Sequence, residues 1–280
     1  LNETANVCEV ALLGEAVTGI AAGDFTVIGG LSGWTVASVT GSGSGPYVVT
    51  LANGSPADGT LGLRIAANAA QDAGGNTVPA SAADASATIT IDVTAPSSTP
   101  SITSGPAAAI NVSSATIAFM GAGSGETYQC ALDGGAWGAC TSPKAYAGLS
   151  EASHTFEVRI ADAAGNTTTA ATRTFTVDTT APTSTVTLTA KPADPDNSTT
   201  PSFGFSGAIA GETYQCQIDT GAWTACTTPW TAPALAEGVH TFRVRTVDAA
   251  GNGGTAASST FTVDVTPPGG TPIFDSTPSN

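Results

Sequence analysis

The stretch that decides the fold is Thr155-Phe156-Glu157-Val158-Arg159-Ile160, then Asp162-Ala163-Ala164-Gly165-Asn166, then Thr174-Phe175-Thr176-Val177-Asp178. The first and last pieces alternate apolar and polar residues, which is the period of a half-buried strand. The middle piece predicts a turn, because glycine adopts positive φ and aspartate hydrogen-bonds backbone two residues further on. The stretch therefore predicts two strands joined by a turn.

This unit recurs along the chain. Asp248-Ala249-Ala250-Gly251-Asn252 repeats the turn, and Asp72-Ala73-Gly74-Gly75-Asn76 is a more distant copy. The strand that follows recurs at one constant spacing and ends at Asp92, Asp178 and Asp264. Repetition of one supersecondary unit is typical of tandem domains. Short alternating runs with regular turn residues and no helical period predict an all-β chain of immunoglobulin-like β-sandwiches.

We expect three such domains in an extended array, at residues 1–95, 96–181 and 182–267, followed by a tail at 268–280. The third domain opens with an alternating run at 183–189 before its core strand, whereas the first domain has no such opening. A sandwich that lacks one strand leaves backbone groups unpaired at a sheet edge. The tail carries the apolar pair Ile273 and Phe274, so we expect it to be a donor strand that completes the first domain of the next identical copy.

Two arrangements satisfy this expectation. Separate subunits could assemble head-to-tail by donating the tail strand, which forms an open filament because the contact is heterologous. Alternatively, residues 1–280 are one period of a longer continuous chain. The sequence leaves both open, together with a first domain that is simply incomplete.

Composition excludes several function classes. The chain has 7 basic and 22 acidic residues in 280, a formal net charge of −15, and only 10% charged residues. This acidic balance argues against nucleic-acid binding, which needs a basic patch. Two histidines leave little material for acid–base catalysis, so we expect no enzyme activity. The apolar runs are shorter than the roughly 20 residues of a membrane-spanning helix, so we expect no membrane insertion.

Four of the five cysteines fall into two pairs in matching text. Cys130 and Cys140 lie in the segment Tyr-Gln-Cys to Trp-Gly-Ala-Cys, and Cys216 and Cys226 repeat the pattern. The spacing does not fit a zinc site, so we interpret each pair as a disulfide across a hairpin. Disulfides indicate an exported protein. Cys8 is left over and is interpreted as a small buried residue.

Beyond these deductions, the combined text of 96–268 resembles the tandem bacterial Ig-like repeats of large surface and adhesin proteins. Residues 1–95 resemble a sister type of the same repeat, on the segments 13–20 and 22–27. The resemblance implies extracellular stalks, spacers and fibres that generally lack catalytic residues.

The same resemblance, with the acidic balance, suggests calcium at the predicted domain junctions, held by Asp92, Asp178 and Asp264. Calcium takes six to eight oxygen ligands, and each junction offers few. The competing interpretation is that each aspartate hydrogen-bonds the local backbone at a strand end. No other cofactor is expected.

Paired aromatic and histidine residues also have two interpretations. His154 and His240 precede Thr-Phe in matching positions, which indicates a structural role at a turn. Trp137 and Trp223 follow the disulfide-hairpin turns and either cover the core or stack on a sugar, and Trp230 could mark a local contact. The favoured function is a structural repeat unit of an extracellular filament or adhesin stalk at the cell surface. The alternative is an adhesin module that binds a surface glycan or host ligand.

Overall fold

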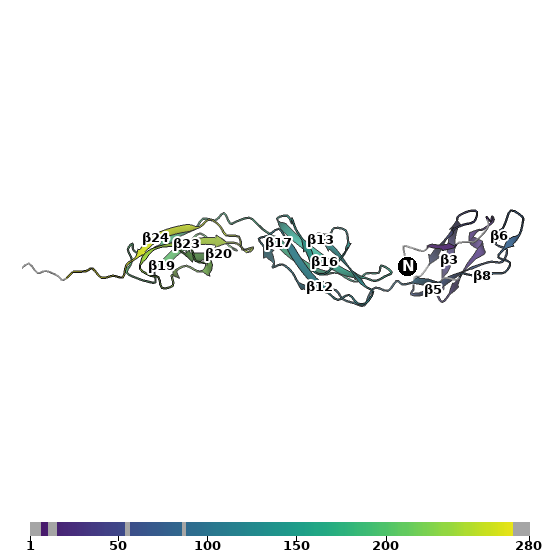
Figure 1. Ribbon diagram of the computed structural model, residues 1–280, viewed down its shortest axis with the longest axis horizontal. Helices are drawn as coiled ribbons and strands as arrows, with labels where there is room; N and C mark the ends of the chain where they lie inside the picture. The colour runs from purple at the N-terminus through teal and green to yellow at the C-terminus, as the bar shows by residue number, and fades with distance from the viewer. Residues whose placement is uncertain (1–6, 11–15, 54–56, 86–87, 271–280) are drawn as a thin grey trace, which may run out of the picture. The chain divides into compact units, whose positions relative to one another are not determined.

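The computed structural model describes residues 7–10, 16–53, 57–85 and 88–270, with only the backbone described for 7–10 and 53 (Figure 1). Within these residues, strands pair inside three successive parts of the chain. We call these parts the first, second and third strand groups, covering residues 7–91, 101–177 and 187–263. The regular structure other than strands is one 3-10 turn, η1 (Ala22–Asp24). No helix among the described residues is long and apolar enough to cross a membrane.

The first strand group forms two main sheets. One sheet has the order β1-β4-β3, and the other has the order β2-β5-β8 with β9 also paired to β5; β6 and β7 form a two-stranded ribbon. The strands are β1 (Val7–Val10), β2 (Phe25–Gly29), β3 (Trp34–Thr40), β4 (Tyr47–Asn53), β5 (Gly59–Ile65), β6 (Ala70–Gln71), β7 (Thr77–Val78), β8 (Ala83–Asp84) and β9 (Ile89–Ile91).

The second strand group has sheets of order β10-β12-β15 and β11-β17-β16-β13-β14. Its strands are β10 (Ser101–Ser104), β11 (Ala109–Ile110), β12 (Ala115–Met120), β13 (Thr127–Leu132), β14 (Gly138–Cys140), β15 (Lys144–Tyr146), β16 (Ala152–Ala161) and β17 (Ala171–Val177).

The third strand group repeats this plan with sheets β18-β19-β22 and β21-β20-β23-β24. Its strands are β18 (Thr187–Ala190), β19 (Ser202–Ser206), β20 (Thr213–Ile218), β21 (Thr224–Cys226), β22 (Trp230–Thr231), β23 (Gly238–Val247) and β24 (Ala257–Val263). The predicted strand–turn–strand unit is present, because β23 pairs antiparallel with β24 from Gly238↔Val263 to Val244↔Ala257.

Alternation along each strand places the core between the two sheets. In β16, Phe156, Val158 and Ile160 are fully buried while the residues between them are half-buried. Phe156 lies against Phe119 of the facing sheet, with ring centroids 5.8 Å apart. A two-residue side-chain period on both sheets is what closes a sandwich. The prediction of all-β, immunoglobulin-like sandwiches is therefore confirmed.

Packing divides the chain into two compact units, and their boundary runs inside the second strand group. One unit comprises 1–105, 117–144 and 155–173, and the other comprises 106–116, 145–154 and 174–280. The domain boundaries at 95, 181 and 267 therefore stay predictions. The tail residues Ile273 and Phe274, proposed above as an assembly strand, lie outside the described residues.

Candidate functional site

The repeated Asp-Ala-Ala-Gly-Asn turn is a hydrogen-bonded cage around its own aspartate. Asp162 Oδ1 accepts hydrogen bonds from the backbone N–H groups of Gly165 at 2.7 Å and Asn166 at 2.9 Å, and Asn166 Nδ2 donates to Asp162 Oδ2 at 2.9 Å. Asp248 and Asn252 repeat these contacts, with 2.9 Å between Asn252 Nδ2 and Asp248 Oδ2. Partial burial raises the pKa of both aspartates, but the hydrogen bonds outweigh it and lower the pKa overall. The turn thus fixes the direction of its asparagine side chain.

The same asparagine reaches back to the end of an earlier strand. An amide nitrogen carries two hydrogens, and Asn166 Nδ2 uses the second to donate to the backbone oxygen of Asp92 at 2.9 Å. Asn252 Nδ2 donates in the same way to the backbone oxygen of Asp178 at 2.7 Å. Asp92 follows β9 and Asp178 follows β17. Each contact lies inside one compact unit and joins the end of one strand group to the turn of the next.

The aspartate side chains cap the chain that leaves each strand. Asp92 Oδ1 accepts from the N–H of Thr94 at 3.2 Å, and Asp178 Oδ1 accepts from the N–H of Thr180 at 3.1 Å. Asp264 Oδ1 accepts from the N–H of Thr266 at 3.1 Å. Aspartate commonly bonds the backbone two residues on in this way. The side chains of the three sequence-predicted residues therefore stabilise the backbone at the start of the linker.

A second carboxylate, which belongs to the strand group before the linker, also accepts hydrogen bonds from each linker. Glu151 Oε1 accepts from the N–H of Thr179 at 2.9 Å and from the hydroxyl of Thr180 at 2.9 Å. Glu237 Oε1 holds the N–H of Val265 at 2.9 Å and the hydroxyl of Thr266 at 2.6 Å. In the first group, Asp58 accepts from the N–H of Val93 at 2.7 Å and also from the Thr94 hydroxyl.

These clamps change the acidity of the carboxyl groups. The Thr179 hydroxyl, followed by the Thr180 hydroxyl, lowers the pKa of Glu151 below its ordinary value of 4.5. The Thr94 hydroxyl, followed by the Val93 N–H, lowers the pKa of Asp58. Each hydrogen bond favours the ionised carboxylate. The hydrogen bonds of Glu151 in one group and of Asn252 in the next thus both restrain the linker after Asp178.

This arrangement bears on the calcium expectation for Asp92, Asp178 and Asp264. Among the residues that the structure describes, no three His, Cys, Asp or Glu side chains gather as a metal site. At two of the junctions the position beside the aspartate is taken by an asparagine N–H₂ group, which donates hydrogen bonds instead of supplying a ligand oxygen. Calcium at these residues stays a prediction, which titration with calcium chloride in a calorimeter tests.

The predicted cysteine pairs and tryptophans lie together on the hairpins. Cys130 is bonded to Cys140, and Cys216 to Cys226, with Cα–Cα distances of 5.9 and 5.8 Å. The guanidinium of Arg159 lies 4.2 Å from the ring centroid of Trp137.

The third group repeats this tryptophan contact. Arg245 lies 4.3 Å from the ring centroid of Trp223, and the same arginine donates to Gln215 Oε1 at 2.8 Å. A cation over the ring uses the face on which a sugar would stack. Trp230 instead packs in the core, stacked on Phe242 with centroids 5.2 Å apart.

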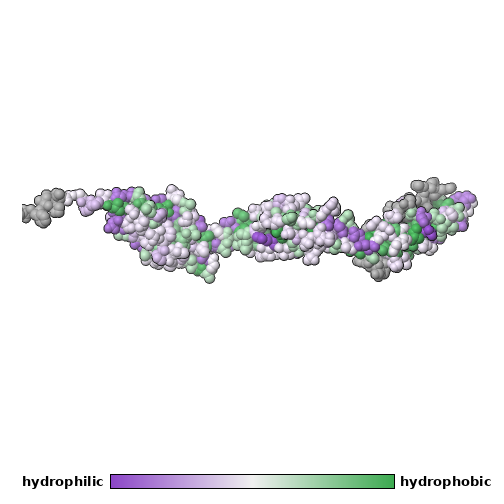
Figure 2. Space-filling view, turned by 90° about the horizontal axis from the view of Figure 1, so that it is seen from below, coloured by the Kyte–Doolittle hydropathy of each residue, from purple (hydrophilic) through white to green (hydrophobic). Residues whose placement is uncertain are grey.

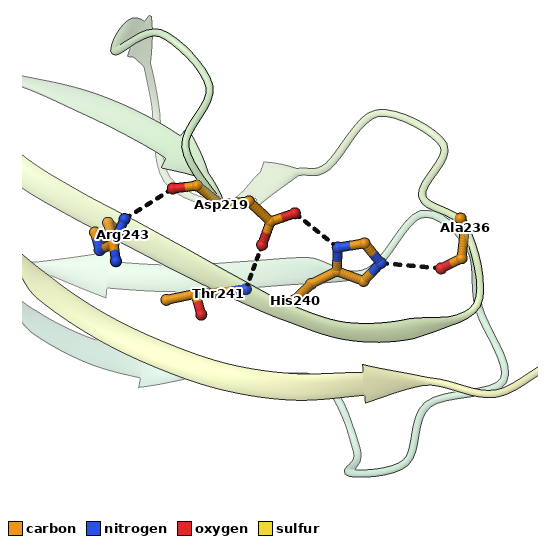
Figure 3. A network of polar contacts seen from close by, with 5 residues as sticks. All are labelled: Asp219, Ala236, His240, Thr241 and Arg243. Atoms are coloured by element: carbon orange, nitrogen blue, oxygen red, sulfur yellow. Dashed lines mark hydrogen bonds and ion pairs between the residues drawn. The ribbon is translucent and has the colours of Figure 1, made fainter.

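The two histidines lie near the start of the long strands β16 and β23. His240 Nδ1 is 2.8 Å from Asp219 Oδ2 and its Nε2 is 3.0 Å from the backbone oxygen of Ala236 (Figure 3). Asp219 also accepts from the N–H of Thr241, and its backbone oxygen accepts from Arg243. The Asp219 hydrogen bond, followed by that of Ala236, raises the pKa of His240 above 6.5.

His154 occupies the matching place in the second group. Its Nε2 is 2.9 Å from the backbone oxygen of Ser150, and its ring lies 5.6 Å from that of Phe175. Both histidines thus hold the chain that enters a core strand.

Sequence reasoning missed the clamping residues Glu151, Glu237, Asn166 and Asn252. A signal for them was present, because each recurs at the spacing of the repeat. Their partners lie 28 and 74 positions away, however, and only the fold identifies them.

The sequence of this chain matches a known domain family. The profile of the bacterial Ig-like domain matches residues 76–179 and 192–265, more than half of the chain. The chain belongs to the bacterial Ig-like domain family. Members of this family are typically structural domains. Together with the two disulfides, the family indicates an extracellular or cell-surface protein. A search of curated proteins gives no match.

Solved structures similar to this bacterial Ig-like chain have low sequence identity. Fibronectin(III)-like modules of Clostridium thermocellum CbhA are 15% identical over 59% of this chain and 94% of theirs, with a TM-score of 0.44. The chicken CNTN1 FN1–FN3 domains are 10% identical over 92% and 97%, with a TM-score of 0.36. A 1.5-MDa bacterial ice-binding adhesin is 21% identical over 90% and 87%, with a TM-score of 0.28.

Proposed function

We propose that this chain is a structural repeat region of an extracellular stalk or filament. The observation that carries the proposal is the double hold on the linker after Asp178, by Glu151 on one side and Asn252 on the other. Asp58 and Asn166 make the equivalent hold after Asp92. A spacer must keep successive domains from folding back, and hydrogen bonds to the linker backbone from both sides oppose that motion. The repetition of the device favours a spacer over a single binding site.

Solution scattering tests this role. The full chain should give a maximum dimension close to that of domains in line, each about 30 Å across by the size law for compact domains. Replacing Glu151 and Asn252 together by alanine should shorten the mean end-to-end distance and broaden its distribution. Replacing Glu157 of β16 and Ser258 of β24 by alanine provides the control. A wild-type chain that samples folded-back shapes as often as the double variant contradicts the proposal.

The alternative, a module that binds glycans through exposed aromatic rings, has less support. The large hydrophobic side chains that are exposed in the described structure are Val78, Val112, Met120, Ile209, Val239 and Val265. None is aromatic. On the face shown in Figure 2, hydrophobic residues are interspersed among neutral and hydrophilic ones.

Head-to-tail strand donation is the finer part of the proposal. In the second and third groups, the core strands β12 and β19 each lie between two partners, β10 with β15 and β18 with β22. Among the described residues, β1 pairs with β4 alone, through Val7↔Thr50 to Val10↔Tyr47. The edge of β1 corresponds to the edge that β10 and β18 cover. We infer that the tail strand with Ile273 and Phe274 of a second copy pairs there.

Two measurements separate the versions of this assembly. Replacing Ile273 and Phe274 by aspartate should abolish association in sedimentation, whereas the same change at the exposed Ile209 should not; unchanged association contradicts donation. The mass of reduced, denatured native material then distinguishes separate subunits from a continuous chain. A discrete species near 27.3 kDa supports donation, and a ladder or very large species supports a covalent chain.

A further inference from the structure

One asparagine turn and one strand end of the kind that pair at the linkers are exposed in the described structure. Asp92 and Asp178, whose backbone oxygens accept from an asparagine, are half-buried, whereas Asp264 is exposed. Asn166 and Asn252, which make the contacts, are half-buried, whereas Asn76 in the corresponding turn is exposed. The exposed members thus lie at opposite ends of the repeat series, Asn76 in the first strand group and Asp264 after the third.

The turn that contains Asn76 has the same internal hydrogen bonds as the turns of Asn166 and Asn252. Asp72 Oδ1 accepts from the N–H of Asn76 at 2.8 Å, and Asn76 Nδ2 donates to Asp72 Oδ2 at 2.8 Å. The backbone N–H of Asp72 donates to the oxygen of Asn76 at 3.0 Å, as Asp162 and Asp248 do in their turns. The second hydrogen of Asn76 Nδ2 has no acceptor among the described residues. The donor is therefore oriented before any partner arrives.

The receiving strand end is equally prepared. Asp264 Oδ1 caps Thr266, and Glu237 holds the N–H of Val265. The N–H of Asp264 donates to the backbone oxygen of Asp196 at 2.9 Å. Within the described part of the chain, no hydrogen bond reaches the backbone oxygen of Asp264, which is the atom that asparagine grips at Asp92 and Asp178.

An apolar contact accompanies the hydrogen bond. Gly254, two residues after Asn252, lies so close to the half-buried linker residue Pro182 that a Cβ there would sit 3.2 Å from the Pro182 oxygen and 3.6 Å from its Cβ. The positions that match these two residues are Val78, two after Asn76, and Pro268, four after Asp264. Val78 is 38% exposed, and Pro268 is exposed as well. Val78 and Pro268 are thus exposed, whereas Pro182 at the paired contact is half-buried.

We propose that the Asp72–Asn76 turn of one copy of this chain binds the Asp264–Pro268 segment of a second copy, with Asn76 Nδ2 donating to the backbone oxygen of Asp264 and Val78 packing on Pro268. This contact rests on the proposed head-to-tail function and names a second interface for it, separate from the tail strand. It sets the angle between successive copies by the same device that holds the linkers inside the chain.

The test compares association constants of the full chain by sedimentation equilibrium. Asn76→Asp replaces the donor by a carboxylate of the same charge as Asp264 and should weaken association about ten-fold, the size of effect expected when one hydrogen bond is lost. Asn68→Asp is the matched control, since it adds the same charge in the same group and keeps the acceptor for the Thr77 hydroxyl. Asp264→Asn removes one of the facing charges, keeps an oxygen to cap Thr266, and should partly restore association in the Asn76→Asp background. A purely local effect on the turn predicts no such rescue.

Hydrogen exchange on the same samples adds a second readout. Backbone amides of 72–78 and 264–266 should gain protection as the wild-type concentration rises. Association that Asn76→Asp leaves unchanged, while aspartate at Ile273 and Phe274 abolishes it, overturns this inference and leaves strand donation standing. The reverse pattern supports the inference and removes strand donation. A chain that stays monomeric at about 1 mM overturns both.

Discussion

Asn252 donates one side-chain hydrogen to the backbone oxygen of Asp178 at 2.7 Å and the other to Asp248 Oδ2 at 2.9 Å. The residues that it joins are 74 positions apart. One amide group therefore closes a turn in the third strand group and holds the strand that ends the second. The same relationship links Asn166 to Asp92, so the device is a property of the repeat.

Removing this amide should loosen the linker more than it destabilises the fold. Asn252→Ala deletes two hydrogen bonds at a half-buried site, and we expect a loss of about 1–2 kcal/mol in unfolding free energy. Proteolysis between Asp178 and Pro182 should accelerate, since the Asp178 oxygen loses its partner. Ser258→Ala, on the exposed face of β24, is the control. Equal cleavage rates in both variants would exclude a role for Asn252 at the linker.

The clamp by Glu151 should titrate. The Thr179 and Thr180 hydroxyls lower the pKa of the Glu151 carboxyl group. The contribution of this group to folding stability is therefore present above pH 4.5, the ordinary pKa, and is lost as the pH falls through the lower pKa of the folded state. The amide proton resonance of Thr179 should follow this transition in a nuclear magnetic resonance titration, with a midpoint below 4.5. Glu151→Gln should remove the transition. A midpoint at or above 4.5 would contradict the hydrogen-bonded carboxylate.

The pair of Asp219 and His240 predicts a second pH effect. The pKa of His240 is raised, first by Asp219. The contribution of His240 to folding stability is therefore fully present below pH 6.5 and is lost as the pH rises through the pKa of the folded state. Desolvation raises the pKa of Asp219, but hydrogen bonds from His240 and Thr241 lower it overall, so its contribution is lost as the pH falls through a value below 3.8. The Asp219 side chain is 45% exposed, which limits the pair to less than about 1 kcal/mol.

Thermal unfolding measures this pair. Wild type should be more stable than His240→Gln at pH 5.5, and the difference should shrink by pH 8.5. The same comparison of His240 with His240→Gln is then made in chains that carry Asp219→Asn. If the carboxylate is the partner, the stability difference should no longer depend on pH. A difference that grows with pH would rule out the charged pair.

The hairpin disulfides should stabilise their own strand groups. Replacing Cys216 and Cys226 by serine releases a short loop between β20 and β21 and should cost about 3 kcal/mol on the chain-entropy account. Protection from hydrogen exchange should fall in β20 and β21 and remain unchanged in β13 and β14, where Cys130 and Cys140 are intact. Unchanged unfolding of the serine variant would show that aromatic packing of Phe203 on Phe242 suffices.

Much of the sandwich could be predicted from local text. Alternation at 155–160 and 174–177 requires one buried face, and that face does pack on the opposite sheet through Phe156. The cysteine pairs could be predicted because the hairpin between them is short. The roles of Glu151 and Asn252 could not, because a carboxylate or amide side chain has no preferred partner until folding fixes its distance to a backbone group.

The sequence by itself determined the repeat, the strands, the turns and the disulfide pairs, because each depends on side-chain period or on residues within a few positions. Only the tertiary structure decided what holds the linkers, since Asn166 and Asn252 meet the oxygens of Asp92 and Asp178 only after two strand groups have formed. It also showed that Asp92, Asp178 and Asp264 cap the backbone, because a hydrogen bond requires a donor at about 3 Å and the chain supplies that donor two residues on.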